Sequence, residues 1–128
     1  MRVLFVEDDA MNRKVVRDML SVGGASMEEA DTAELGLEMI GREDYDLILM
    51  DLRMPAMDGL TAIGHVRARG DAKATLPIIV VTADTGSSII ADCLEGGADL
   101  VLQKPVAMND LFDAMGRLAL KHSMNFSL

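Results

Sequence analysis

The chain has 128 residues, half of them hydrophobic, and a formal net charge of −9 at neutral pH. Its length suits a single domain with its own core, and its negative charge argues against nucleic acid or an anionic membrane as a partner. One cysteine excludes an internal disulfide, and no apolar run approaches the ~18 residues of a membrane span, so we expect a cytoplasmic protein.

The first half of the chain begins with an apolar strand predicted at residues 2–6. A helix follows, because apolar residues recur there at helical spacing. A weaker strand is predicted at residues 25–30, and Asp31 and Glu34 then form a plausible cap for a second helix. The inward face of the first helix is predicted to carry Met11, Val15, Val16 and Met19.

The second half of the chain continues the same alternation of apolar runs and helical patterns. Strands are predicted at residues 47–50, 77–81 and 100–102, and helices at about 59–68, 87–97 and 108–121.

Several of these strands are continuous apolar runs rather than alternations of apolar and polar residues. Such runs are typical of strands that are covered on both faces, as in a parallel sheet between two layers of helices. We therefore predict a doubly wound α/β fold with five strands and five helices. In that fold the carboxyl ends of the strands meet at one edge, where ligands bind.

Polar residues follow four of the five strands: Glu7 and Asp8, then Asp51, Thr82 and Lys104. Two carboxylates about 5 Å apart repel each other by ~3 kcal/mol at an effective dielectric constant of 20, so the acidic group needs a counter-charge. A hard cation such as Mg²⁺, bound through oxygen, would supply it. Together with an ammonium and a hydroxyl group this makes a cradle for a phosphoryl group. Asp51 is the candidate nucleophile.

These residues lie in the segments "VEDD", "LILMDLRMPAMDG", "VVTAD" and "LQKPV". In this order and combination they resemble the receiver domains of two-component response regulators, in particular the single-domain chemotaxis type. The resemblance implies a flavodoxin-like sheet with strand order 2-1-3-4-5. It also implies a receiver domain over residues 1–121, with residues 122–128 as a C-terminal tail.

The resemblance further implies a role for each residue at the strand ends. Asp51 would be the phosphoacceptor, with Asp8 as a direct ligand of Mg²⁺ and Glu7 as a ligand through water. Arg53 would offer its backbone carbonyl to the metal. Thr82 and Lys104 would contact the phosphoryl group.

Three further positions are implied to regulate the phosphorylated state. The side chains of Arg53 and Asp84 would tune the lifetime of the phosphoryl group. Val101 occupies a switch position that is often aromatic in the family, so we expect the switch to depend more on the loop after the fourth strand.

The expected function is a signalling switch that receives a phosphoryl group from a histidine kinase or a histidine phosphotransfer protein. It would act on a downstream protein through the last two helices, or pass the group onward, since only seven residues follow the last predicted helix. We do not expect an enzyme beyond its own phosphorylation and dephosphorylation. The alternatives are a receiver module of a hybrid histidine kinase, an aspartate-nucleophile phosphatase and a non-phosphorylated adaptor.

The remaining polar and unusual residues receive plainer interpretations. Asp9 is expected to start the first helix rather than bind metal, and Cys93 to be a packing residue. The basic stretch at residues 65–70 is expected to be a solvated helix end. Phe112 and Met115 are candidates for an adaptable partner surface.

Overall fold

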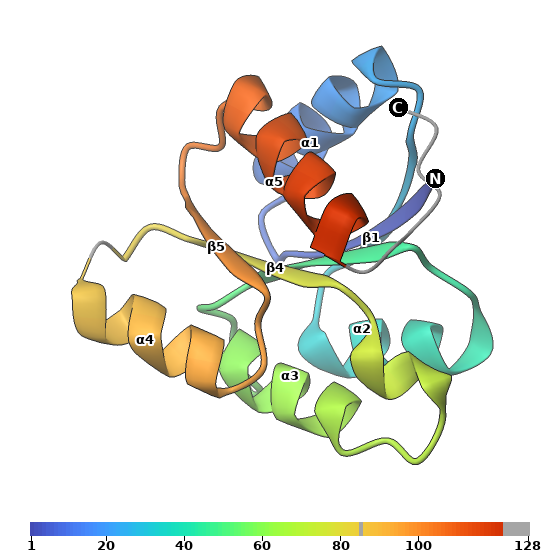
Figure 1. Ribbon diagram of the computed structural model, residues 1–128, viewed down its shortest axis with the longest axis vertical. Helices are drawn as coiled ribbons and strands as arrows, with labels where there is room; N and C mark the ends of the chain where they lie inside the picture. Colours follow the sequence, from blue (N-terminus) through green and yellow to red (C-terminus); the bar gives the residue numbers. More distant parts are fainter. Residues whose placement is uncertain (85, 122–128) are drawn as a thin grey trace.

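The protein, described by a computed structural model over residues 1–84 and 86–121, forms one five-stranded parallel sheet with helices on both faces (Figure 1). The strand order is β2-β1-β3-β4-β5, which confirms the predicted fold. The predicted tail at residues 122–128 lies outside the described residues. The strands are β1 (Arg2–Val6), β2 (Ser26–Ala30), β3 (Leu47–Asp51), β4 (Ile78–Thr82) and β5 (Leu100–Gln103). The helices are α1 (Ala10–Val22), α2 (Ala33–Arg42), α3 (Gly59–Arg67), α4 (Ser87–Glu95) and α5 (Met108–Lys121), with a short 3₁₀ helix, η1, at Ala72–Thr75.

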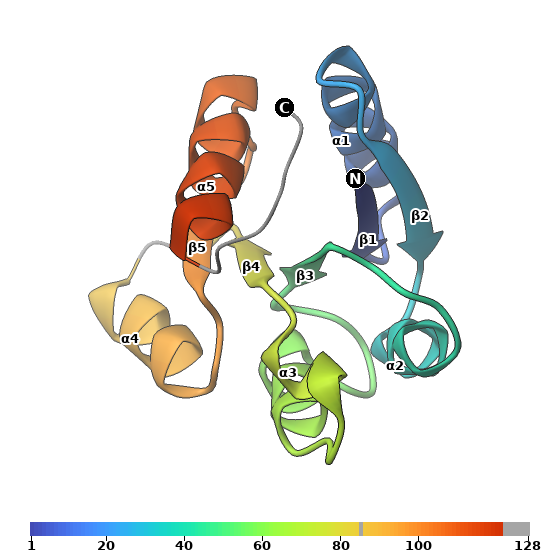
Figure 2. The ribbon, with the colours of Figure 1, turned by 45° about the vertical axis from the view of Figure 1, so that its right-hand side comes forward.

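Two hydrophobic cores lie on opposite faces of the sheet (Figure 2). One packs α1 and α5 against the sheet, and the other packs α2, α3 and α4 against the opposite face. Every residue of β3 and β4 is buried, as expected for central strands covered on both sides. Among the described residues, no helix is both long and apolar enough to cross a membrane.

Short polar side chains start the helices that surround the carboxyl edge of the sheet. Asp9 caps α1 by accepting a hydrogen bond from the backbone N–H of Met11 at 2.8 Å, as predicted. Thr32 caps α2, so the prediction of Asp31 as the cap was wrong by one residue. Asp58 caps α3, and these caps satisfy N–H groups that have no partner within the helix.

Helix α1 presents a different face to the sheet from the one predicted. Met11 and Val15 are 67% and 42% exposed, whereas Val16 and Leu20 are buried. The inner column therefore runs at intervals of four through Val16 and Leu20, and Asn12 lies on the same column one turn earlier. The prediction was right for Val16 and for Met19, which packs against the core, and wrong for Met11 and Val15, because α1 has more apolar residues than one stripe of the helix can bury.

The end of α3 is more buried than its basic sequence suggested. Arg67 is half-buried, and its guanidinium donates hydrogen bonds to the backbone carbonyls of Ala74, Leu76 and Gly97 at 2.9, 2.7 and 2.9 Å. It also pairs with Asp99 at 3.1 Å. The prediction of a solvated helix end was therefore wrong for Arg67, which connects η1 to the loop before β5.

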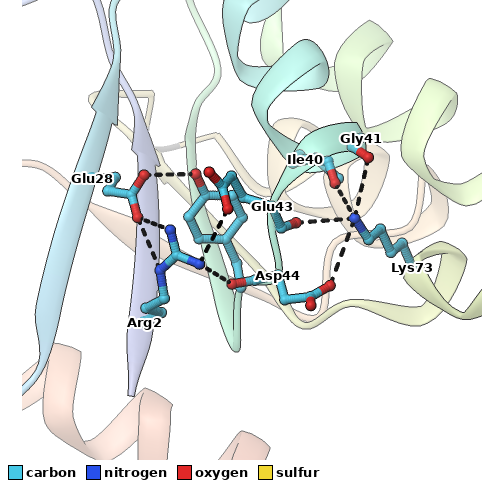
Figure 3. A network of polar contacts seen from close by, with 8 residues as sticks. Arg2, Glu28, Ile40, Gly41, Glu43, Asp44 and Lys73 are labelled. Carbon is cyan, nitrogen blue, oxygen red and sulfur yellow. Dashed lines mark hydrogen bonds and ion pairs between the residues drawn. The ribbon is translucent and has the colours of Figure 1, made fainter.

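A second polar network lies at the amino ends of the strands (Figure 3). Arg2 pairs with Glu28 and donates to the backbone carbonyl of Asp44 at 3.0 Å. Lys73 donates to the carbonyls of Ile40 and Glu43 at 2.6 and 3.0 Å, where α2 ends. Because cations at a helix C-terminus satisfy its free carbonyls, Lys73 fixes the end of α2 against η1.

Two of the remaining side-chain predictions have clear outcomes. Cys93 is buried, as expected of a packing residue. Met115 is fully buried in the core under α1 and α5, so its prediction as part of a partner surface was wrong. Phe112 is half-buried and packs at the edge of the same core.

Candidate functional site

The carboxyl ends of β1, β3, β4 and β5 bring four polar side chains to one edge of the sheet. Glu7 follows β1, Asp51 ends β3, Thr82 ends β4, and Lys104 follows β5. The backbone N–H of Lys104 donates to the carbonyl of Thr82 at 2.8 Å, so the pairing of β4 with β5 continues into the site. These residues are on neighbouring strands, and the parallel sheet alone brings them together.

Lys104 bridges the two buried carboxylates of this edge. Its Nζ lies 2.6 Å from Oε1 of Glu7 and 3.1 Å from Oδ1 of Asp51. Glu7 is fully buried and Asp51 is 4% exposed, while Lys104 is half-buried. Buried charges are tolerated when they are paired and hydrogen-bonded, and one cation here serves two anions.

Glu7, Asp8 and Asp51 form a cluster that could hold a metal ion. One carboxylate oxygen of each lies within 4.8 Å of the others. Oε2 of Glu7 is buried and has no hydrogen-bond partner among the described residues. Such an oxygen is available to a cation or to a water molecule in its shell. The three side chains offer only oxygen atoms as metal ligands, and Asp8 is exposed to solvent. This suits a hard ion that keeps several of its water molecules.

The pKa values in this cluster show that a second negative charge is poorly accommodated beside the first, so Asp51 holds its proton more tightly than an exposed aspartate does. Burial, together with the neighbouring Glu7, raises the pKa of Asp51 to about 7, although Lys104 opposes the shift. Burial alone would raise the pKa of Glu7 too, but hydrogen bonds with Asp51, Lys104 and Asn12 bring it below its ordinary value. Burial disfavours the charge of Lys104, yet its bonds to both acids raise its pKa. The pocket therefore carries more negative charge than one lysine neutralises.

The two loops beside Asp51 are joined by an ion pair. Nε and Nη2 of Arg53 both lie 2.8 Å from Oδ2 of Asp84, which links the loop after β3 to the loop after β4. Thr82 is fully buried, and its hydroxyl accepts a hydrogen bond from the backbone N–H of Asp84 at 3.1 Å. Val101 is half-buried and packs against the core under α2, α3 and α4.

Comparison with known protein families shows which family the chain belongs to. The family described as the response regulator receiver domain matches residues 3–116. The chain is a receiver domain of this family. Receiver domains are phosphoacceptor signalling modules of two-component systems, found in response regulators and in hybrid histidine kinases, and the family resemblance seen in the sequence is confirmed.

Curated relatives of this receiver domain include both of those protein types. The chain is 40% identical over 111 residues to the response regulator MprA of Mycobacterium leprae, which covers 87% of this chain and 47% of that protein. It is 37% identical over 114 residues to the hybrid signal transduction histidine kinase G of Dictyostelium discoideum, covering 87% of this chain and 3% of that protein. The chain thus spans about half the length of the mycobacterial regulators that it matches.

Solved receiver domains have the same fold. The receiver domain of a sensor histidine kinase from Pseudomonas aeruginosa, with a magnesium ion coordinated in its active-site cleft, superposes with a TM-score of 0.82 at 31% identity. That match covers 91% of this chain and 94% of the other. The chemotaxis protein CheY4 of Vibrio cholerae superposes with a TM-score of 0.83 at 26% identity, covering 91% and 96%.

Two side chains of the receiver site were missed from the sequence. Asn12 donates to Oε1 of Glu7 at 2.8 Å, and Arg13 donates to the backbone carbonyl of Glu7 at 2.7 Å. The spacing of residues along α1 could have indicated Asn12, because it precedes the buried Val16 by four residues and so lies on the same face of the helix. It could be used only once the inner face of α1 was known.

Proposed function

We propose that Asp51 accepts a phosphoryl group from a phosphohistidine on a partner protein. The observation that supports this is the contact of Lys104 with both Asp51 and Glu7, inside a buried acidic cluster at the ligand-binding edge of the sheet. A carboxylate at the end of a buried central strand is held rigidly, as a nucleophile must be.

In this proposal the acidic cluster binds Mg²⁺. Asp8 and Asp51 would be direct ligands, Glu7 would act through a water molecule, and Arg53 would contribute its backbone carbonyl. When bound, the ion neutralises charge on the phosphoryl oxygens as the transition state forms. A receiver domain at 31% identity that has magnesium in its cleft supports this assignment.

The transfer itself would use the residues around Asp51. A carboxylate oxygen of Asp51 attacks phosphorus, the phosphorus–nitrogen bond to the donor imidazole breaks with its electron pair remaining on nitrogen, and the imidazole leaves as the neutral base after taking up a proton from water. Lys104 would exchange its contact with the Asp51 carboxylate for a phosphoryl oxygen, and the hydroxyl group of Thr82 would donate a hydrogen bond to another phosphoryl oxygen. The domain would thereby catalyse its own phosphorylation, and its own dephosphorylation by water.

Arg53 and Asp84 would set the lifetime of the acyl phosphate, since their ion pair crosses between the two loops beside Asp51. With Val101 at the switch position, no large aromatic ring can change rotamer there. The response would therefore depend on the loop after β4, which Thr82 and Asp84 connect to the site. Breaking the Arg53–Asp84 pair would free that loop to move.

The phosphodonor would be a histidine kinase or a histidine phosphotransfer protein in the cytoplasm. A downstream protein would bind the last two helices, where β5 and α5 form a groove of about 120 Å³ lined by Val101, Asp110 and Arg117. We assign the receiver domain to residues 1–121. The match to the hybrid signal transduction histidine kinase G of Dictyostelium discoideum supports a receiver module of a hybrid kinase as a second candidate.

The proposal is tested with a small-molecule phosphodonor and Mg²⁺, read on a phosphate-affinity gel for wild type and Asp51→Asn. We expect a retarded band in wild type alone, and chelation of the metal should abolish it. Asp113→Asn, an exposed aspartate on α5, is the matched control and should be phosphorylated like wild type. An equal band in Asp51→Asn would refute Asp51 as the acceptor.

A further inference from the structure

The carboxylate of Glu7 is held asymmetrically. Its Oε1 accepts two hydrogen bonds, from Nδ2 of Asn12 at 2.8 Å and from Nζ of Lys104 at 2.6 Å. Its Oε2 is equally buried and receives no hydrogen bond among the described residues. An unpaired buried oxygen costs free energy, so a fixed orientation that leaves one here points to a ligand.

The first turns of α1 fix Glu7 at both its backbone and its side chain. Arg13 donates to the Glu7 carbonyl at 2.7 Å and pairs with Glu29 on β2 at 3.1 Å. Asn12 continues the inner column of Val16 and Leu20, which anchor α1 in the core. Asn12 is thus supported by a packed helix rather than by a mobile loop.

The two donors to Glu7 differ in what they can do during phosphorylation. In the proposed function Lys104 exchanges Asp51 for a phosphoryl oxygen, so its charge is then shared between Glu7 and the phosphoryl group. Asn12 is neutral, so a phosphoryl group attracts it far less strongly than it attracts Lys104. Among the described side chains that contact Glu7, Asn12 is therefore the one that can keep its orientation before and after transfer.

We propose that Asn12 is a positioning residue that holds Glu7 through Oε1 and so keeps Oε2 available to the hydration shell of Mg²⁺. The inference rests on the proposed function and deepens it. Partners of metal ligands that lie outside the first coordination shell commonly change metal affinity by about 10- to 100-fold when they are removed. Asn12 would act in this way, although it touches neither the metal nor the phosphoryl group.

The test is calorimetric titration of Mg²⁺ into the unphosphorylated protein, for wild type, Asn12→Leu, Asn12→Ala and Asn12→Gln. We expect Leu and Ala to weaken Mg²⁺ binding about tenfold. Gln retains the amide donor and should remain closer to wild type. Ser21→Ala, which removes a neutral polar group from the exposed far end of α1, should bind Mg²⁺ like wild type.

Urea unfolding in chelator separates positioning from folding. A purely structural role would lower the stability of the Leu and Ala variants but leave the Mg²⁺ affinity of their folded state unchanged, and that result would overturn the proposal. Equal losses in Gln and Leu would also overturn it, because the amide would then be irrelevant. If wild type itself binds no Mg²⁺, the proposed function fails, and this inference fails with it.

Discussion

Replacing Asp51 by asparagine should stabilise the metal-free protein at about pH 8. Asp51 is 4% exposed and lies beside Glu7, and its pKa is raised from 3.8 to about 7. At about pH 8 the folded protein must therefore hold an unfavourable charge that the unfolded chain accommodates in water. Asparagine removes this charge, and its amide oxygen can still accept the hydrogen bond from Lys104.

The expected gain follows from the difference between the two pKa values. The pKa of Asp51 is raised by about three units, and each unit corresponds to about 1.36 kcal/mol, which gives about 4 kcal/mol as an upper limit. Water entering near the carboxylate reduces this penalty, so we expect Asp51→Asn to raise the free energy of unfolding by roughly 2 to 4 kcal/mol.

The sign of the pH dependence is a separate check. A group whose pKa is raised on folding stabilises the protein below its unfolded pKa, and that contribution is lost as pH rises through its folded pKa. Wild type should therefore lose stability relative to Asp51→Asn between about pH 4 and pH 7. The difference should be small at about pH 4 and greatest at about pH 8.

The assay is urea unfolding in chelator and then in Mg²⁺. Asp113→Asn controls for the loss of an exposed aspartate and should change stability by less than about 0.5 kcal/mol. If the acidic cluster binds Mg²⁺ as proposed, Mg²⁺ at 100 times its dissociation constant should add about 2.7 kcal/mol to wild type, and less to Asp51→Asn, which lacks the charge of a proposed ligand. If Asp51→Asn were no more stable than wild type in chelator at about pH 8, the charge argument would be refuted.

Three further predictions concern packing and polar contacts elsewhere in the scaffold and at the turn after Asp51. Arg67→Ala removes the donor of three backbone carbonyls and of Asp99, so the free energy of unfolding measured in urea should fall by about 3 kcal/mol. The control is Arg69→Ala, which breaks a pair with exposed Asp71. It should lower the free energy of unfolding by less than about 1 kcal/mol. The single tyrosine, Tyr45, has its pKa raised to about 12 by burial and by Glu28. The tyrosinate absorbance of the folded protein should therefore appear with a midpoint at about pH 12, and the free energy of unfolding should fall as the pH rises from about 10 to about 12. An absorbance midpoint at about pH 10, before the protein unfolds, would contradict this. Gly59→Ala would place a Cβ 2.2 Å from the backbone oxygen of Asp51, so thermal melting should show that the protein loses more than about 2 kcal/mol of stability. The Cβ of Gly64→Ala, on the same helix, meets nothing within 4 Å. That variant should be about 0.5 to 1 kcal/mol more stable than wild type.

The sequence by itself determined the fold class and the position of the site. Continuous apolar runs such as residues 47–50 identify buried parallel strands, because only strands covered on both faces can omit polar residues. A parallel sheet then places the residues that follow its strands at one edge. For that reason Glu7, Asp51, Thr82 and Lys104 could be predicted to lie together, although they are far apart in the chain.

Only the tertiary structure decided which faces turn inward and which long side chains find partners. Helical periodicity in α1 was satisfied by Met11 and Val15 as well as by Val16 and Leu20, and packing against the sheet selected the second pair. That choice brought Asn12 to Glu7. Local pattern records the spacing of residues along an element, whereas the rotation of a helix is fixed by elements distant in sequence.

The partners of two arginines were likewise decided by elements distant in sequence. Arg67 reads as part of a basic surface stretch, yet it contacts Gly97 and Asp99, about thirty residues later in the chain. Arg53 meets Asp84 across two loops in the same manner. A flexible side chain with several donors can reach many partners, so its sequence neighbours do not define its role. The partner depends on which carbonyls and carboxylates the folded chain leaves within reach.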